Sequence, residues 1–136
     1  MKYMLLLAAC LAGMTGTAYA ANECDNPQDQ GTLTECADKA FRKSDADLNK
    51  LYKQIEARAK GDADKAKLLV TAQRAWIAFR DAECDFASSS SAGGSIYPML
   101  VLQCRDGMTQ ARIKEFRAYL TCRDDDLQCP LPADEN

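Results

Sequence analysis

Apolar residues in the first half of the chain recur at steps of three and four, the spacing of one face of an α-helix. The first such face consists of Ala37, Phe41, Ser44, Leu48, Leu51, Tyr52, Ile55 and Ala59. Thr32 and Glu35 fit a capping box, so this helix is expected to begin at Thr32. It should end at Gly61, with Asp62 or Asp64 capping the helix that follows.

A second helix with the same periodicity is expected to run as far as Ser88. Trp76 and Phe79 are its expected core anchors. Its predicted inward face consists of Leu68, Leu69, Ala72, Ala75, Trp76, Phe79 and Phe86. The run Ser88–Ser95 contains only serine, alanine and glycine, a composition that favours a loop over a helix.

The third helical segment is expected to be capped by Ser95 and interrupted at Gly107, with Thr109 capping a last helix. The inward residues of that last helix are Ile113, Phe116 and Leu120. From about residue 123 the tail is irregular, and no run alternates with period two for long enough to predict a strand. The pattern therefore predicts an all-α fold: a long antiparallel helical hairpin with one or two shorter helices packed on it.

The start of the chain has the features of an export signal. Lys2 precedes the apolar run Met4–Ala12, and Thr17–Ala20 ends in the small-x-small pattern of a cleavage site. Cleavage after Ala20 would leave one domain, residues 21–136, with a net charge of −4 in place of −3. The apolar run is too short to span a bilayer. Cys10, at the end of a lipobox-like sequence, is an alternative site for a lipid anchor.

Export changes the interpretation of the cysteines. An even number in a small exported domain predicts a disulfide framework. The six that remain after cleavage are Cys24, Cys36, Cys84, Cys104, Cys122 and Cys129. Cys122 and Cys129 lie apart from the other four and are expected to pair. The two helical turns place Cys84 opposite both Cys36 and Cys104, so both of those pairings stay open.

Composition removes several classes of function. The 136 residues include 17 Lys and Arg, 20 Asp and Glu, and no histidine, which excludes every mechanism built on an imidazole. A nucleic-acid partner is not expected without a basic stripe. Neither a metal nor another cofactor is expected, because the cysteines lack zinc spacing and the acidic runs lack the pattern of a calcium loop.

Two groups of residues are candidates for a special role. If the first two helices pair as a hairpin, Asp45 lies near Arg80 and Asn49 near Arg74; with Asp81 these residues would form a polar lattice. Such a lattice either fixes the helix register or forms a recognition surface. The second group is a loop in which small residues allow close backbone approach and two larger ones act as anchors. Its candidate partner-binding residues are Asp85, Gly93, Gly94, Ser95, Ile96 and Tyr97.

Several segments resemble the LprI-type lysozyme inhibitor domain, over about residues 24–120. They are Asp45–Tyr52, Ala72–Cys84, Gly93–Ser95, Cys104 and Thr109–Arg112, with Gln-Arg-x-Trp-Ile-x-Phe-Arg-Asp-x-x-Cys as the most specific motif. The resemblance implies a periplasmic or secreted bacterial protein without catalytic activity, whose partner is lysozyme and which inhibits it by occluding the cleft. A cell-envelope interaction module without effect on lysozyme is the alternative. An enzyme acting on peptidoglycan is disfavoured by the missing histidine and by the absence of a recognisable carboxylate pair.

Overall fold

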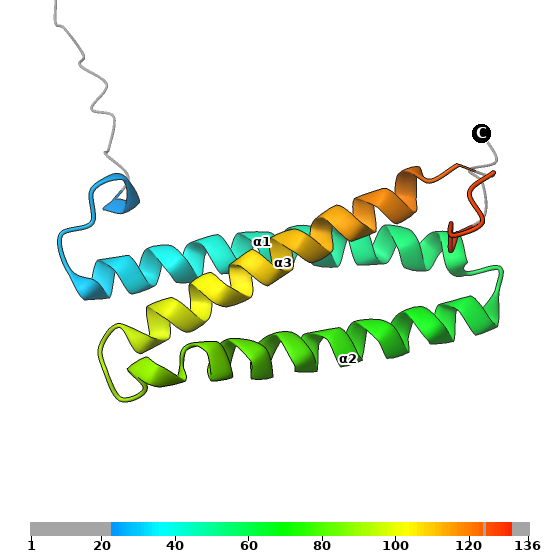
Figure 1. Cartoon of the computed structure of the whole chain (residues 1–136). Helices are drawn as coiled ribbons and strands as arrows, with labels where there is room; N and C mark the ends of the chain where they lie inside the picture. Colours follow the sequence, from blue (N-terminus) through cyan, green and yellow to red (C-terminus); the bar gives the residue numbers. More distant parts are fainter. Residues whose placement is uncertain (1–22, 124, 132–136) are drawn as a thin grey trace, which may run out of the picture.

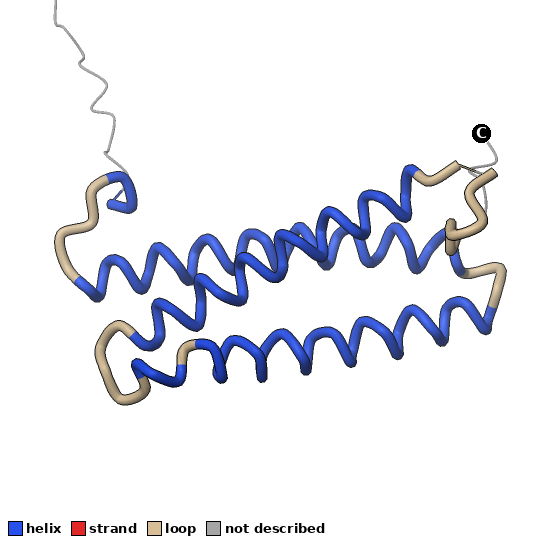
Figure 2. Tube along the Cα trace, in the orientation of Figure 1, coloured by secondary structure: helices blue, strands red, loops and turns tan. Residues whose placement is uncertain are grey.

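Helices make up most of the residues that the computed structural model describes, 23–123 and 125–131. The elements are η1 (Glu23–Asp25), α1 (Gln30–Ala59), α2 (Ala63–Ala87), η2 (Ser89–Ser91) and α3 (Tyr97–Thr121), as Figure 1 shows. No strand occurs within these ranges (Figure 2), so the all-α fold class is confirmed. The predicted signal peptide, including Lys2, Cys10 and the cleavage site at Ala20, lies outside the described residues.

The cap of α1 lies one turn earlier than expected. Asp29 is the N-cap: its carboxylate accepts hydrogen bonds from the backbone N–H of Thr32 at 2.8 Å and from the Thr32 hydroxyl at 3.0 Å. The prediction of Thr32 as the cap is therefore wrong, because Asp29 satisfies the first free amides of the helix. These bonds, the backbone one first, lower the pKa of Asp29. At the start of α2 the cap is Asp62, which accepts from the Lys65 N–H at 3.0 Å.

The third helix is longer and simpler than predicted. It runs unbroken through Gly107, so the expected interruption is wrong; one glycine costs a helix only about 1 kcal/mol relative to alanine, and packing along α1 supports α3 on both sides of it. Thr109 is not a cap but is fully buried within the helix. Ser95 is not a cap either, since Ile96 holds the N-cap position without a side-chain hydrogen bond.

The hydrophobic core lies mainly where α1 crosses α3 (Figure 1). Phe116 of α3 is completely buried between the rings of Tyr52 and Tyr119, whose centroids lie 6.5 and 6.1 Å away. Leu131 brings the tail into the same cluster. The buried members are Leu48, Ile55, Ala59, Ile113, Phe116 and Leu131. Among the α2 residues, Leu69 and Trp76 reach this core, and each is only partly buried.

The face that α2 turns inward differs from the predicted one. Leu68, Phe79 and Phe86 are 68%, 57% and 76% exposed, so their assignment to the core is wrong. We name the inward-facing set the inner row: Leu69, Gln73, Trp76, Arg80 and Cys84. Four of these five positions lie one residue after an apolar position of the predicted face, and one residue turns a helix by about 100°. Apolar periodicity correctly predicts Leu69 and Trp76 to face inward. It misses Gln73 and Arg80 because they are polar and find partners on α1 and α3.

Three disulfides join neighbouring segments. Cys24–Cys36 attaches η1 to α1, Cys84–Cys104 links α2 to α3, and Cys122–Cys129 closes the tail. The pairing of Cys122 with Cys129 is confirmed. The structure selects Cys104 rather than Cys36 as the partner of Cys84, because α2 packs more closely on α3 than on α1.

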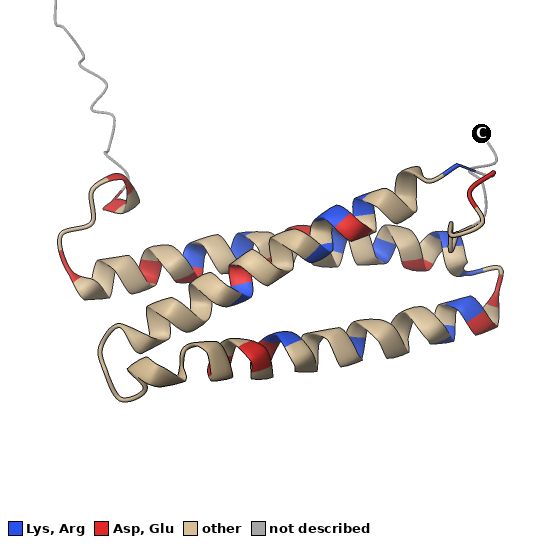
Figure 3. Cartoon of the chain, viewed as in Figure 1, with Lys and Arg blue, Asp and Glu red and all other residues tan. Residues whose placement is uncertain are grey.

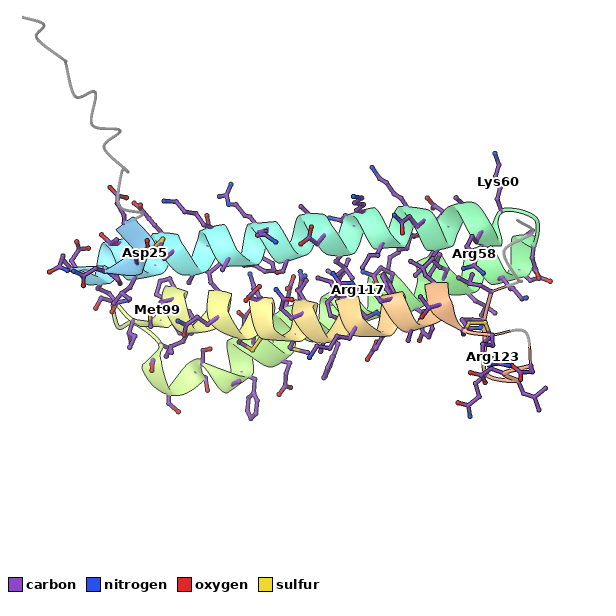
Figure 4. The ribbon with its side chains drawn as sticks, turned by 90° about the horizontal axis from the view of Figure 1, so that it is seen from above. Asp25, Arg58, Lys60, Met99, Arg117 and Arg123 are labelled. Atoms are coloured by element: carbon purple, nitrogen blue, oxygen red, sulfur yellow. A yellow bond between two sulfur atoms is a disulfide. The ribbon has the colours of Figure 1, made fainter. Side chains whose placement is uncertain are left out.

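The two ends of the bundle differ in construction. Figure 4 shows Met99 at the same end as Asp25, and Arg58 with Lys60 at the end that contains Arg123. We call the first the loop end, because residues 88–96 connect α2 to α3 there, and the second the turn end. A contact of 3.5 Å from the Gln30 amide to the Met99 sulfur joins α1 to α3 at the loop end. None of the helices described is long and apolar enough to cross a membrane.

Candidate functional site

Arg80 is the centre of a buried polar cluster between the three helices. Its side chain is only 7% exposed and lies 3.2 Å from the Asp45 carboxylate and 2.9 Å from that of Asp81. It also donates to the Thr109 hydroxyl of α3 at 3.3 Å. The contact expected between Asp45 and Arg80 therefore forms, and the arginine joins all three helices through one planar group.

Two further arginines extend this cluster along α3. Arg105 lies 3.4 Å from Asp81 and 3.3 Å from Asp85. Arg112 packs 5.7 Å above the ring of Trp76. Arg80 lies 5.3 Å from the same ring, so the indole contacts two guanidinium groups. Cations over an aromatic ring are stabilised by its quadrupole, and more strongly when water is excluded.

Two members of the predicted lattice do not meet. Asn49 donates to Asp45 on its own helix at 3.1 Å and is exposed. Arg74 is also exposed and, within the part of the chain that the structure describes, forms no hydrogen bond or ion pair with the cluster. The expected contact between Asn49 and Arg74 is therefore wrong. Simple hairpin pairing assumed that α2 packs along α1, whereas α1 packs chiefly on α3.

Sequence reasoning missed the contribution of α3 to this cluster. Arg105, Thr109, Arg112 and Phe116 follow one another at steps of four, three and four, so they share one helix face. Gln73 was missed too: its side-chain oxygen accepts from Arg112 at 3.4 Å. The signal was present as two arginines and a threonine at helical spacing on the same face as Phe116, but apolar periodicity alone does not detect it.

The loop from Ser88 to Ile96 has a defined shape. Ser88 is buried, and the Ser91 carbonyl accepts from the Gly94 N–H at 3.0 Å. Gly93 has φ of +81°, in the region that favours glycine. A Cβ atom at Gly94 would lie 3.2 Å from the Ser91 oxygen, so a side chain there would shift the turn. The backbone of this loop is thus held by its own hydrogen bonds and by its glycines.

The same loop presents free polar groups and one apolar side chain. Within the described residues, the backbone N–H groups of Gly93, Ser95 and Ile96 donate no hydrogen bond. The Ile96 side chain is 41% exposed, and Tyr97, half-buried, begins α3. The structure therefore brings Gly93, Gly94, Ser95, Ile96 and Tyr97 together at one end of the molecule, where they are accessible to a partner.

Charge is distributed unevenly around this loop. The sequence contains no charged residue between Asp85 and Arg105, and the loop end of α2 and α3 accordingly has no charge in Figure 3. Asp85 borders this neutral region with its side chain 56% exposed, although it is ion-paired with Arg105. The 88–96 loop is thus a neutral tip next to acidic residues on α2, and at the same end η1 and the cap of α1 are acidic through Glu23, Asp25 and Asp29. No group of three or more residues that could ligate a metal occurs in the described ranges.

Fold and site together define a class: a small, disulfide-bridged, three-helix domain with a buried arginine cluster and an accessible loop at one end. The chain belongs to the LprI lysozyme inhibitor family, because the family model described as "Lysozyme inhibitor LprI" matches residues 21–116. It is also 35% identical over 127 residues to uncharacterized protein R02472 of Rhizobium meliloti (strain 1021), covering 85% of this chain and 91% of that protein. No solved structure matches the chain.

The sequence motif in residues 73–84, by which the chain resembles the LprI family, has a structural explanation. Its inward positions Gln73, Trp76, Arg80 and Cys84 are all members of the inner row. Each one attaches α2 to a neighbouring helix: Gln73 by a hydrogen bond, Trp76 by a cation–π contact with Arg112 of α3, Arg80 by an ion pair and Cys84 by a disulfide. The motif therefore specifies how the helices are held together, and recognition of a partner has to be sought on the surface.

Proposed function

We propose that this protein is an exported inhibitor of lysozyme that occludes the enzyme's cleft with its 91–97 loop. Membership of the LprI family carries this proposal. Glycosidases of the lysozyme type cleave their substrate between two carboxyl groups in an open cleft. A proteinaceous loop that enters such a cleft blocks it without any chemical step, so the inhibitor needs no catalytic group of its own.

Electrostatics supports the loop end as the contact. Hen-type lysozymes are cationic outside and acidic within the cleft. The neutral tip formed by residues 91–97 can enter an acidic cleft without like-charge repulsion. Asp85, beside the tip, and the net charge of −4 that remains after cleavage attract the cationic rim and speed encounter. The free N–H groups of Gly93, Ser95 and Ile96 are available as donors to cleft oxygens.

Export to the periplasm or beyond is part of this proposal. Disulfides persist in oxidising compartments, and the structure contains three of them in a small domain. The segment 1–20 supplies the predicted signal peptide, with cleavage after Ala20 and a lipid on Cys10 as the alternative. Mass spectrometry of the protein purified from an exporting host distinguishes the two, since cleavage after Ala20 makes Ala21 the first residue and lipidation makes Cys10 the first.

The direct test is a cell-wall lysis assay with hen-type and goose-type lysozymes. The oxidised chain is added in stoichiometric excess, and a reduced sample serves as control. Saturable inhibition that disappears on reduction is the expected result, because the loop is held by a disulfide-bridged scaffold. If neither lysozyme is slowed, the proposal fails and an envelope interaction module without inhibition takes its place. Lysis by the chain alone would indicate an enzyme instead.

Variants of the loop test the contact itself. Tyr97→Ala and Gly94→Trp should raise the concentration needed for half-inhibition by about tenfold or more, the effect of removing a central interface residue. Leu127→Ala is the matched control, since Leu127 is fully exposed at the turn end. Circular dichroism should show unchanged helix content in all three. Full inhibitory potency in both loop variants would show that the loop does not contact lysozyme.

A further inference from the structure

One side of α2 carries an apolar row that nothing in the described chain covers. Its members follow one another at steps of four, three, four, three and four, and all of them are exposed. This outer row consists of Leu68, Ala72, Ala75, Phe79, Ala82 and Phe86. Alternating steps of three and four are the spacing by which one helix packs against another in a coiled coil. The outer row therefore has the spacing of a helix-pairing surface.

The two ends of the outer row have complementary shapes. Phe86 projects at the loop end, with 76% of its surface exposed. At the other end a cavity of about 440 Å³ opens beside the row, and Leu68 and Ala72 are among its lining residues. Tyr119 and Leu131 form part of its apolar wall. A projecting ring and a recess thus lie on one helix, about 27 Å apart at 1.5 Å per residue.

We propose that the chain forms a two-fold dimer in which the outer rows of two α2 helices pack antiparallel. A two-fold axis at the level of residue 77 sets Leu68 opposite Phe86 of the second copy, and Ala75 opposite its Phe79. Each large ring then meets a smaller side chain, and both Phe86 rings lie beside the cavity of the other copy. Because the same patch is used on both copies, the contact closes and needs no third molecule.

A parallel arrangement lacks these advantages. It would place Phe79 against Phe79 and Phe86 against Phe86, leaving both cavities unfilled. Charge favours the antiparallel choice as well. Lys67 and Asp85 are 18 residues apart, which is five full helix turns, so they lie on the same edge of the outer row. Antiparallel packing brings Lys67 of one copy toward Asp85 of the other. In a parallel two-fold pair this edge lies on opposite sides of the interface in the two copies, so the two charges do not meet.

A second copy fits the outer row better than a membrane surface does. An amphipathic helix that lies on anionic lipid flanks its apolar face with lysine and arginine. Here Glu83 and Asp85 are the charged neighbours of Phe86, the most exposed of the large side chains in the row. In the antiparallel dimer the two 91–97 loops lie at opposite ends, so dimerisation leaves both of them accessible.

Sedimentation equilibrium of the oxidised chain tests the dimer, over about 1 to 300 µM, a range suited to a small interface. Phe79→Glu should raise the dissociation constant at least tenfold while circular dichroism stays unchanged. Ile77→Glu is the matched control: Ile77 is also an exposed apolar residue of α2, 38% accessible, but it lies two residues from Ala75 and Phe79 and hence on the opposite side of the helix. A wild-type monomer throughout, or equal weakening by both variants, overturns the proposal.

The orientation is tested with a photoreactive phenylalanine analogue in place of Phe86, followed by peptide mapping of the crosslinked dimer. Crosslinks to residues 65–72 of the second copy are expected. Crosslinks to residues 82–90 would indicate a parallel pair and contradict the proposal. The same experiment in the presence of hen-type lysozyme tests whether the enzyme, rather than a second copy, occupies the outer row. If the analogue crosslinks to lysozyme and the chain sediments as a monomer, the outer row binds the enzyme and the dimer proposal is wrong.

Discussion

Helix α2 carries two rows of residues, offset by a single position, that differ in almost every respect. The inner row contains a glutamine and an arginine and is held by α1 and α3 through hydrogen bonds, ion pairs and a disulfide. The outer row contains only leucine, alanine and phenylalanine and is exposed. Polarity therefore does not decide which side of this helix is buried; the availability of partners for the polar groups does.

The difference assigns separate roles to the two rows. A buried polar group that loses its partner destabilises the fold, so a substitution in the inner row should lower the free energy of unfolding. An exposed row of apolar residues adds little to the stability of the monomer, so a substitution there should change the dissociation constant of the dimer instead.

The largest contrast is between two aromatic residues of α2. Trp76→Ala should lower the free energy of unfolding by about 3 kcal/mol, because the indole packs on the core and between two guanidinium groups. Phe79→Ala, at 57% exposure, should change it by less than about 0.5 kcal/mol when measured at concentrations that favour the monomer. Urea unfolding of both variants checks the pair. Equal losses would contradict the separation of the rows.

The disulfide of the inner row gives the next effect. Replacing Cys84 and Cys104 together by serine should cost about 2 to 3 kcal/mol, since the bridge closes a loop of 20 residues in the unfolded chain. The same change at Cys122 and Cys129, which are seven residues apart, should cost less. Thermal unfolding of the two double variants checks which bridge contributes more. A larger loss of stability in the Cys122 and Cys129 variant would contradict this prediction.

A conservative change at Arg80 should still be harmful. Arg80→Lys retains the charge, but one ammonium group cannot reach Asp45, Asp81 and the Thr109 hydroxyl in the geometry of a guanidinium. The expected loss is about 1.5 kcal/mol. Lys67→Arg, an exchange of the two cations at an exposed position of α2, is the control and should be neutral in the same unfolding assay. If Arg80→Lys leaves the free energy of unfolding unchanged, the cluster stabilises the fold through charge alone and the planar shape of the guanidinium contributes nothing.

The smallest effect depends on pH and concerns the cap of α1. The pKa of Asp29 is lowered below its ordinary value of 3.8, first by the hydrogen bond from the Thr32 N–H. Its contribution is therefore complete above pH 3.8 and is lost as the pH falls through the lowered value. Asp29→Asn retains a capping oxygen but does not titrate. The stability of the wild type relative to Asp29→Asn should rise with pH across this window, and a constant difference from pH 2 to 6 would contradict the assignment.

Local sequence signals predicted the fold class and several details. Turn chemistry narrowed the cap of α2 to Asp62 or Asp64 and located the loop at residues 88–95, and the isolated position of Cys122 and Cys129 predicted their bridge. The signals failed where a choice depended on contacts between distant segments. Apolar periodicity placed Leu69 and Trp76 correctly but also assigned most of the outer row of α2 to the core. Glycine was overrated as a break at Gly107, and the partner of Cys84 stayed open. Each of these is decided by how the three helices pack on one another, which no short window of sequence contains.

The candidate site likewise contains residues that the sequence could predict and residues that it could not. Asp45 and Arg80 could be paired from the hairpin rule because they lie at similar distances from the turn at Gly61 and Asp62. Arg105 and Arg112 could not, since α3 was expected to break between them. The loop residues were recognised from composition alone, and the structure adds what composition lacks, namely the turn geometry, the free N–H groups and the neutral surroundings.

Amide hydrogen exchange of the oxidised chain, with and without saturating hen-type lysozyme, is the most direct test of the central claim that the helices form a scaffold and the loop end binds the enzyme. Lysozyme should slow exchange in residues 89–97 and leave the turn end, residues 60–63 and 127–131, unchanged. Slower exchange only at the turn end or along α1, or no change anywhere, would contradict the account.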